Sequence, residues 1–77
     1  MKLTIKYFGL IAEATHCVEE QLEFEGATIS DLKEVLFQKY LNLKQKDFQI
    51  AQDNEIVENE TKITGLEIAL LPPFAGG

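Results

Sequence analysis

Two adjacent side chains, His16 and Cys17, are the first candidates for chemistry, because an imidazole beside a thiol can activate a nucleophile. Successive residues on an extended chain point to opposite sides, and the sequence offers no third group to orient the histidine. One histidine and one cysteine also cannot complete a structural zinc site. We therefore interpret the pair as surface residues without a catalytic role, and we expect no bound metal.

Acidic side chains are the second candidates, since paired carboxylates can act as general acid and base. Four of them lie close together in the sequence, Glu19, Glu20, Glu23 and Glu25. Their alternation with apolar residues is typical of the solvated face of a strand. Glu20 alone falls on the apolar side, and we expect it near a sheet edge where its carboxylate reaches water. No conventional active site is predicted.

The C-terminal segment LPPFAGG, residues 71–77, is the remaining candidate. Pro72 and Pro73 lack N–H donors and hold φ at about −65°, so strand pairing should stop there. The residues from Pro72 onward span at most about 20 Å at roughly 3.3 Å each. Gly76 and Gly77 present bare backbone, which passes where a β-carbon would collide. We expect an arm that enters a partner's cleft, and a disordered end is the alternative.

Composition restricts the partners of this arm. Thirteen acidic and seven basic residues among 77 give a formal charge of −6, which opposes binding to nucleic acid or to an anionic membrane and suits a basic protein surface. The alternating start, residues 1–7, is unlike a signal peptide, and no apolar run is long enough for a membrane span. With one cysteine, no internal disulfide can form. We expect a soluble, cytoplasmic protein of one small domain.

Period-2 alternation predicts the strands that must position the arm. The first strand covers residues 2–7 and the last covers 66–71, with a second strand near 18–24, a short strand at 48–51 and a brief apolar patch at 56–57. A short helical turn is expected at 10–14. The apolar faces expected to be buried consist of Leu3, Ile5 and Tyr7, then Val18, Leu22 and Phe24, and finally Leu66, Ile68 and Leu70.

A helix should begin after Thr28, whose side chain can cap it while Asp31 returns the bond. Phe37 and Leu41 lie off its apolar stripe, and either pack on the flank or meet a partner. The stripe itself comprises Ile29, Leu32, Val35, Leu36 and Tyr40.

The order of elements predicts an α+β fold, a ubiquitin-like β-grasp with a mixed sheet covered on one face by one main helix. A helical crossover makes the first and last strands parallel neighbours. The domain would cover residues 1–71, and 72–77 would form a flexible C-terminal tail. Phe8 and Leu71 would then face away from the helix, with Phe74 beyond them, as a partner surface. Alternatively Phe8 tucks under the following loop.

The whole chain resembles the small, sulfur-carrying subunit of molybdopterin synthase, the MoaD family. The likeness rests on the opening IKYFG, the helix start ATISDLKEVL and the ending LPPFAGG. Two departures are visible. Ala12 stands near the place of a common arginine, and the turn before the last strand, residues 64–67, is not the usual acidic one.

The resemblance implies a carrier without an active site or bound cofactor of its own. An ATP-dependent activating enzyme would adenylate the Gly77 carboxylate, and a sulfur donor would convert it to a thiocarboxylate. The large synthase subunit, in a heterotetramer with this chain, would pass that sulfur to a cyclic pterin phosphate. Gly76 would clear the path for Gly77, with Pro72, Pro73, Phe74 and Ala75 in the inserted tail, and Cys17 would take no part.

Three alternatives remain open from the residues. The thiamine sulfur carrier shares the diglycine and its activation, but not usually the double proline. A ubiquitin-like modifier would instead form an isopeptide bond with a lysine. A binding module with an inert tail is the third.

Overall fold

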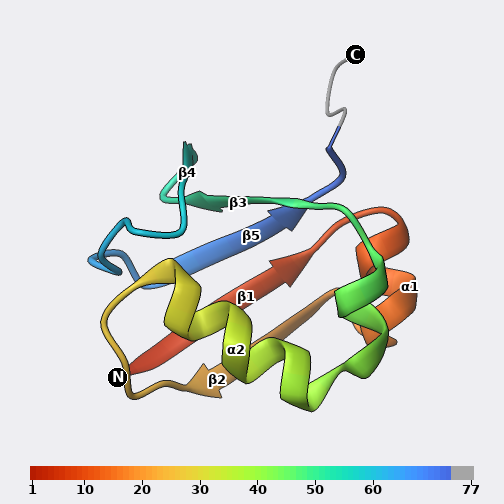
Figure 1. Ribbon diagram of the computed structural model, residues 1–77, viewed down its shortest axis with the longest axis horizontal. Coiled ribbons are helices and arrows are strands. Elements are labelled where there is room, and N and C mark those ends of the chain that lie inside the picture. Colours follow the sequence, from red (N-terminus) through yellow and green to blue (C-terminus); the bar gives the residue numbers. More distant parts are fainter. Residues whose placement is uncertain (74–77) are drawn as a thin grey trace.

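A computed structural model of the chain describes residues 1–73, which form a five-stranded sheet with the strand order β2-β1-β5-β3-β4 (Figure 1). The strands are β1 (Lys2–Tyr7), β2 (Glu19–Glu23), β3 (Gln49–Gln52), β4 (Glu55–Val57) and β5 (Glu67–Leu71). The helical elements are α1 (Leu10–Thr15), α2 (Ile29–Lys39) and a 3-10 helix, η1 (Leu41–Gln45). The predictions for Phe74, Ala75, Gly76 and Gly77 concern residues outside the described range.

The strands β1 and β5 are parallel neighbours in the interior of the sheet, as predicted. Ile5 lies opposite Ile68, and Tyr7 lies opposite Leu70. The other three pairings are antiparallel, β2 with β1, β3 with β5 and β4 with β3. This mixed sheet with its crossover helix confirms the expected β-grasp fold.

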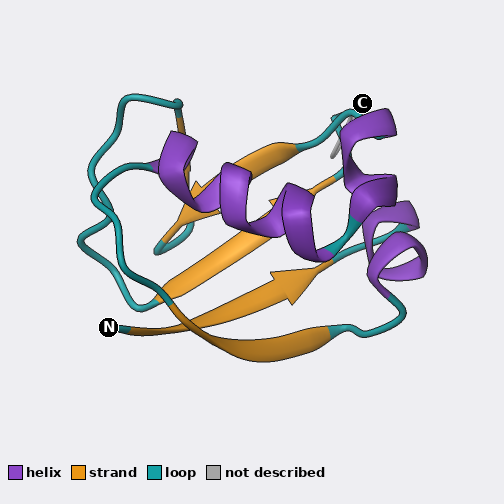
Figure 2. Cartoon of the chain, turned by 60° about the horizontal axis from the view of Figure 1, so that its bottom comes forward, coloured by secondary structure: helices purple, strands orange, loops and turns teal. Residues whose placement is uncertain are grey.

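The core lies between α2 and one face of the sheet (Figure 2). Its central side chains are at most 2% exposed, and full burial of such a side chain contributes about 1.5–3 kcal/mol. They are Leu3, Ile5 and Tyr7 of β1, Ile68 and Leu70 of β5, and Ile29, Leu32 and Leu36 of α2. Within residues 1–73 no helix covers the other face of the sheet, which we call the open face.

The first turn of α2 is closed by the predicted capping box. Thr28 Oγ1 accepts a hydrogen bond from the backbone N–H of Asp31, and Asp31 Oδ2 accepts from the backbone N–H groups of Thr28 and Ala27. These backbone hydrogen bonds lower the pKa of the Asp31 carboxyl below its ordinary value. The helix start is therefore fixed locally, by residues three and four apart in the sequence.

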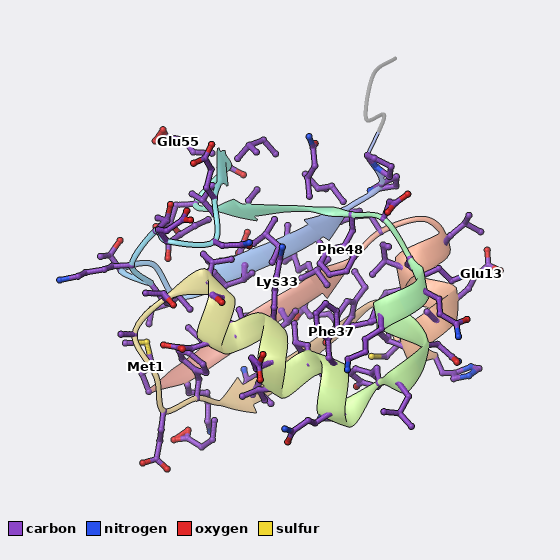
Figure 3. All side chains as sticks on the ribbon, viewed as in Figure 1. Met1, Glu13, Lys33, Phe37, Phe48 and Glu55 are labelled. Atoms are coloured by element: carbon purple, nitrogen blue, oxygen red, sulfur yellow. The ribbon has the colours of Figure 1, made fainter. Side chains whose placement is uncertain are left out.

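The apolar stripe of α2 differs from the prediction at one position. Val35 is 36% exposed, while Phe37 packs against the core and against Phe48, with ring centroids 6.1 Å apart (Figure 3). Phe37 is therefore flank packing, whereas Leu41, at 73% exposed, is not. Through this contact of Phe37, α2 packs on Phe48, the residue directly before β3.

Two residues predicted for buried strand faces are exposed instead, Val18 at 73% and Leu66 at 66%. The helix α1 ends at His16 in a left-handed conformation with φ 63°, so the chain is still turning at Val18, and β2 begins only at Glu19. Leu66 precedes β5, which begins at Glu67, and Ile63 before the turn takes a buried place, at 7% exposed.

The hairpin between β3 and β4 was predicted only as a short strand, a turn and an apolar patch. Asp53 and Asn54 at its tip have φ of 50° and 71°, the left-handed conformation that these residue types tolerate. The turn before β5 is stabilised by Gln52 of β3. Its side-chain Oε1 accepts hydrogen bonds from the backbone N–H of Thr64 at 2.9 Å and of Gly65 at 3.1 Å. Nothing in the local pattern marked Gln52 as buried.

Candidate functional site

The root of the C-terminal tail lies at the end of β5. Leu71 is the last residue of that strand and is half-buried, Pro72 is half-buried and Pro73 is exposed. On one side the Leu70 carbonyl accepts the backbone N–H of Phe8 at 3.2 Å, and on the other Leu71 is paired with Gln49 of β3. The tail therefore leaves from between two neighbouring strands of the sheet.

Phe8 and Leu71 occupy the open face where the tail begins. Phe8 follows Tyr7, which is buried, and its side chain is 44% exposed, so it does not tuck under the following loop. An open groove of about 460 Å³ borders it, lined by Lys6, Tyr7, Phe8, Gly9, Ala12, Val18 and Glu19. An exposed aromatic side chain beside an apolar groove is typical of a surface that a partner covers.

Charged groups adjoin this apolar area on the open face. Lys6 Nζ lies 3.5 Å from Oε2 of Glu67, and both side chains are at least one-third exposed. An exposed pair of this kind contributes little to stability, with a typical value of about 0–1 kcal/mol. Because Lys6 is on β1 and Glu67 is on β5, the pair places one positive and one negative group on the open face near Phe8.

Glu20 lies on the edge strand β2, as predicted, but its carboxylate is partly buried and is bound by three side chains. Its side chain is 16% exposed, and it receives the hydroxyl of Tyr7 at 2.6 Å, the hydroxyl of Tyr40, and Lys39 Nζ at 2.6 Å. Partial burial alone would raise the pKa of Glu20, but these hydrogen bonds together lower it below its ordinary value. Burial and the neighbouring carboxylate raise the pKa of both tyrosines.

His16 and Cys17 do not form a pair on an extended chain. His16 is exposed and has a left-handed backbone, whereas Cys17 is half-buried against the core. The Cys17 Sγ lies 4.0 Å from Glu20 Oε2 and 3.9 Å from the Tyr40 hydroxyl. The prediction of two surface residues is therefore wrong for Cys17, because the turn after α1 directs its side chain inward.

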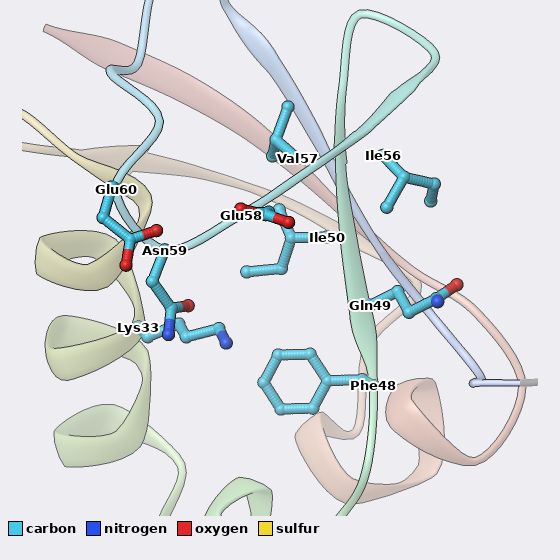
Figure 4. A pocket seen from close by; sticks show the side chains of 9 residues that line it. All are labelled: Lys33, Phe48, Gln49, Ile50, Ile56, Val57, Glu58, Asn59 and Glu60. Atoms are coloured by element: carbon cyan, nitrogen blue, oxygen red, sulfur yellow. The ribbon is translucent and has the colours of Figure 1, made fainter.

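A second pocket, of about 480 Å³, lies between α2 and the β3–β4 hairpin (Figure 4). Lys33 reaches over the ring of Phe48, with Nζ 5.6 Å from its centroid, and Glu58 and Glu60 also line the pocket. Lys33 and Phe48 contact each other within this pocket. None of the residues at the root of the tail, Leu71, Pro72 or Pro73, lines it. We assign it no part in the chemistry of the tail.

Within residues 1–73, no group of three histidine, cysteine or acidic side chains is arranged to hold a metal ion. No helix in that part of the chain is long and apolar enough to cross a membrane.

The residues that sequence reasoning missed are those that act through tertiary contacts. Gly9 was not among the predicted site residues, and Glu20 was expected only near a sheet edge where its carboxylate reaches water. A signal for Glu20 was present, because it was the one charged residue on the apolar side of its strand. For Gly9 the signal is weaker, a glycine two residues after the end of a strand that lies beside the strand leading into Pro72.

Comparison with known proteins assigns the family. Residues 5–77 match the ThiS family. A Pyrococcus furiosus protein named as molybdopterin converting factor, subunit 1, is similar at a TM-score of 0.86 and 25% identity, over 95% of this chain and 98% of that one. Small archaeal modifier protein 1 of Haloferax volcanii shares the fold at a TM-score of 0.81 and 21% identity, over 100% of both chains. Its namesake from Methanosarcina acetivorans does so at 0.74 and 23%, over 99% of this chain and 96% of that one. Since the family match covers nearly the whole length, this chain belongs to the ThiS family and has the ubiquitin-like β-grasp fold.

Proposed function

We propose that this chain is the sulfur-carrier subunit of molybdopterin synthase and that Gly77 carries the sulfur as a terminal thiocarboxylate. The observation that carries the proposal is the position of Pro72 and Pro73 directly after the interior strand β5. A tail that starts from a rigid strand and carries two prolines is restricted at its root. The diglycine end can then pass through a channel too narrow for a β-carbon.

The chemistry follows from the low reactivity of a carboxylate. An oxygen of Gly77 attacks the α-phosphate of ATP on the activating enzyme, pyrophosphate leaves, and the resulting acyl-adenylate has AMP as a good leaving group. A donor that supplies sulfur at the oxidation level of sulfide displaces AMP and leaves the thiocarboxylate. The large synthase subunit then directs that sulfur to a cyclic pterin phosphate.

Two further observations support the molybdopterin role over the other carriers. The double proline before the diglycine is less usual in thiamine sulfur carriers, and the Pyrococcus furiosus protein with 25% identity is named for molybdopterin conversion. The exposed Phe8 and the half-buried Leu71 on the open face would supply the surface that docks on the large subunit or the activating enzyme.

Intact-mass analysis of the full chain tests the proposal. After incubation with the activating enzyme, ATP and a sulfide source, the chain should gain the mass difference of one oxygen replaced by one sulfur. The gain should vanish when Gly77 is deleted and persist in Cys17→Ala. A gain that follows Cys17 instead would overturn the mechanism.

A second assay separates the pathways. The thiocarboxylated chain, mixed with the large synthase subunit and the cyclic pterin phosphate, should lose its sulfur to the pterin. Transfer only to a thiazole-forming enzyme would identify a thiamine carrier. Isopeptide-linked products on lysine, without release of sulfur, would identify a protein modifier.

A further inference from the structure

We propose that Gly9 is a positioning residue that sets the direction in which the tail leaves the sheet, an inference that rests on the proposed function of that tail. The ring of Pro72 lies against the bare α-carbon of Gly9. A Cβ on residue 9 would stand 3.0 Å from Pro72 Cγ and 3.9 Å from Pro72 Cδ. The shorter distance is tighter than an ordinary van der Waals contact.

The backbone of Gly9 is held on both sides and cannot simply move away. The Phe8 N–H donates to the Leu70 carbonyl at 3.2 Å, which ties this segment to β5. The carbonyls of Phe8 and Gly9 accept the N–H groups of Ile11 and Ala12, each at 3.1 Å, which ties it to the first turn of α1. The segment is thus fixed between the strand that bears the tail and the helix beside it.

The end of β1 is anchored as well. Tyr7, two residues before Gly9, is buried and donates its hydroxyl to Glu20 on β2 at 2.6 Å. Tyr7 also lies opposite Leu70 in the parallel pairing, so residues 7 to 9 run alongside residues 70 to 72. The Tyr7–Glu20 hydrogen bond and the Tyr7–Leu70 pairing together hold the end of β1 in place, and with it the position of Gly9 beside Pro72.

Gly9 has φ 58° and ψ −135°, a conformation that side chains with a β-carbon rarely adopt. Glycine therefore meets two demands at once, because it permits this backbone and leaves room for the Pro72 ring. Pro72 in turn has a nearly fixed φ, so the contact of its ring with Gly9 determines the position from which the tail continues.

Pro72 is the first residue of the tail, so a shift of its ring changes the point and the direction from which the tail starts toward the partner. A misplacement of about 1 Å can reduce a reaction rate by about 10²-fold. The contact between Pro72 and Gly9 should therefore affect turnover more than docking, since Gly9→Ala keeps the docking side chains of Phe8 and Leu71.

The test compares Gly9→Ala with the wild-type chain in ATP–pyrophosphate exchange on the activating enzyme. We expect kcat to fall at least tenfold while KM stays within about threefold. Ala14→Gly is the control, because it weakens α1 without adding an atom near Pro72. It should leave both kinetic constants close to those of the wild type.

The double variant Gly9→Ala/Pro72→Ala shows whether the effect passes through the proline ring. Removal of Cγ and Cδ makes room for the new methyl group, while the strain at the positive φ of residue 9 remains, so Gly9→Ala should lower kcat less in the Pro72→Ala background than in the wild type. An equal loss in both backgrounds would assign the effect to backbone strain and overturn the proposal.

Nuclear Overhauser contacts between the Gly9 α-protons and the Pro72 ring protons provide a readout without the enzyme. They should be present in the wild-type chain and weakened in Gly9→Ala. A wild-type chain that is not adenylated would overturn the proposed function. Normal adenylation of both wild type and Gly9→Ala would overturn the role of Gly9 alone.

Discussion

The Tyr7 hydroxyl donates to Glu20 Oε2 across 2.6 Å and joins the end of β1 to the edge strand β2. The Tyr40 hydroxyl binds the same oxygen, and Lys39 binds the other. The two tyrosine rings meet edge to face, with centroids 6.0 Å apart. One carboxylate therefore connects β1, β2 and the end of α2, and it does so next to the segment that carries Phe8.

Glu20→Gln should lower the free energy of unfolding by about 1–3 kcal/mol, because an amide cannot accept all the hydrogen bonds that the carboxylate receives. For a domain of this size each kcal/mol corresponds to a change in Tm of about 4–8 °C. Thermal unfolding measures the shift. Glu23→Gln on the same strand, an exposed position, is the control and should change Tm little. Equal shifts in both variants would contradict a special role for Glu20.

Acid should remove the stabilisation by Glu20. Its pKa in the folded chain lies below the unfolded value of about 4.3, so the unfolded chain takes up a proton first as the pH falls. The stabilisation is thus complete above that pH and is lost as the pH falls through the folded value. The difference in unfolding free energy between wild type and Glu20→Gln should narrow from pH 6 to pH 3 in urea titrations. A constant difference would show that the carboxylate charge is not involved.

Gln52→Ala should destabilise the domain by about 1–3 kcal/mol, since it leaves buried backbone groups unpaired. The side chain is 8% exposed, accepts from Thr64 and Gly65, and donates to the Lys62 carbonyl at 3.2 Å. Gln49→Ala, at an exposed position of the same strand, should cost less than about 0.5 kcal/mol. Urea denaturation of both variants decides whether the side-chain contacts or the strand position matters.

Leu71→Asp and Phe74→Ala should each weaken binding to the large subunit or the activating enzyme while leaving the domain folded. A side chain buried by a partner contributes about 1.5–3 kcal/mol, so the dissociation constant should rise at least tenfold. Calorimetric titration measures it. Leu41→Asp is the matched control, because Leu41 is 73% exposed at the start of η1. Loss of binding in that variant alone would move the interface to α2 and η1.

Gly76→Val should fold normally, as seen by circular dichroism, because the substitution lies after the last strand. It should fail as a carrier, since a β-branched side chain widens the arm next to the reacting group. Adenylation and sulfur transfer measured on the same sample test this. Transfer at the wild-type rate would show that the arm meets no narrow channel.

The sequence by itself determined the fold, because the main signals are local and periodic. Alternation over residues 2–7 placed Leu3, Ile5 and Tyr7 on one face, and the capping box placed the start of α2. The helical crossover then required β1 and β5 to be parallel. The apolar pattern also predicted that Phe8 faces away from the core, where it is exposed.

Only the tertiary structure decided which polar and small residues matter, because their roles arise from contacts between segments far apart in the sequence. Glu20 meets Tyr40 twenty residues on, Gln52 meets Gly65 thirteen residues on, and Gly9 meets Pro72 from the opposite end of the chain. No periodic pattern records such pairs. They depend on the register of β1 with β2 and with β5 and of β3 with β5, and that register results from packing of the whole core.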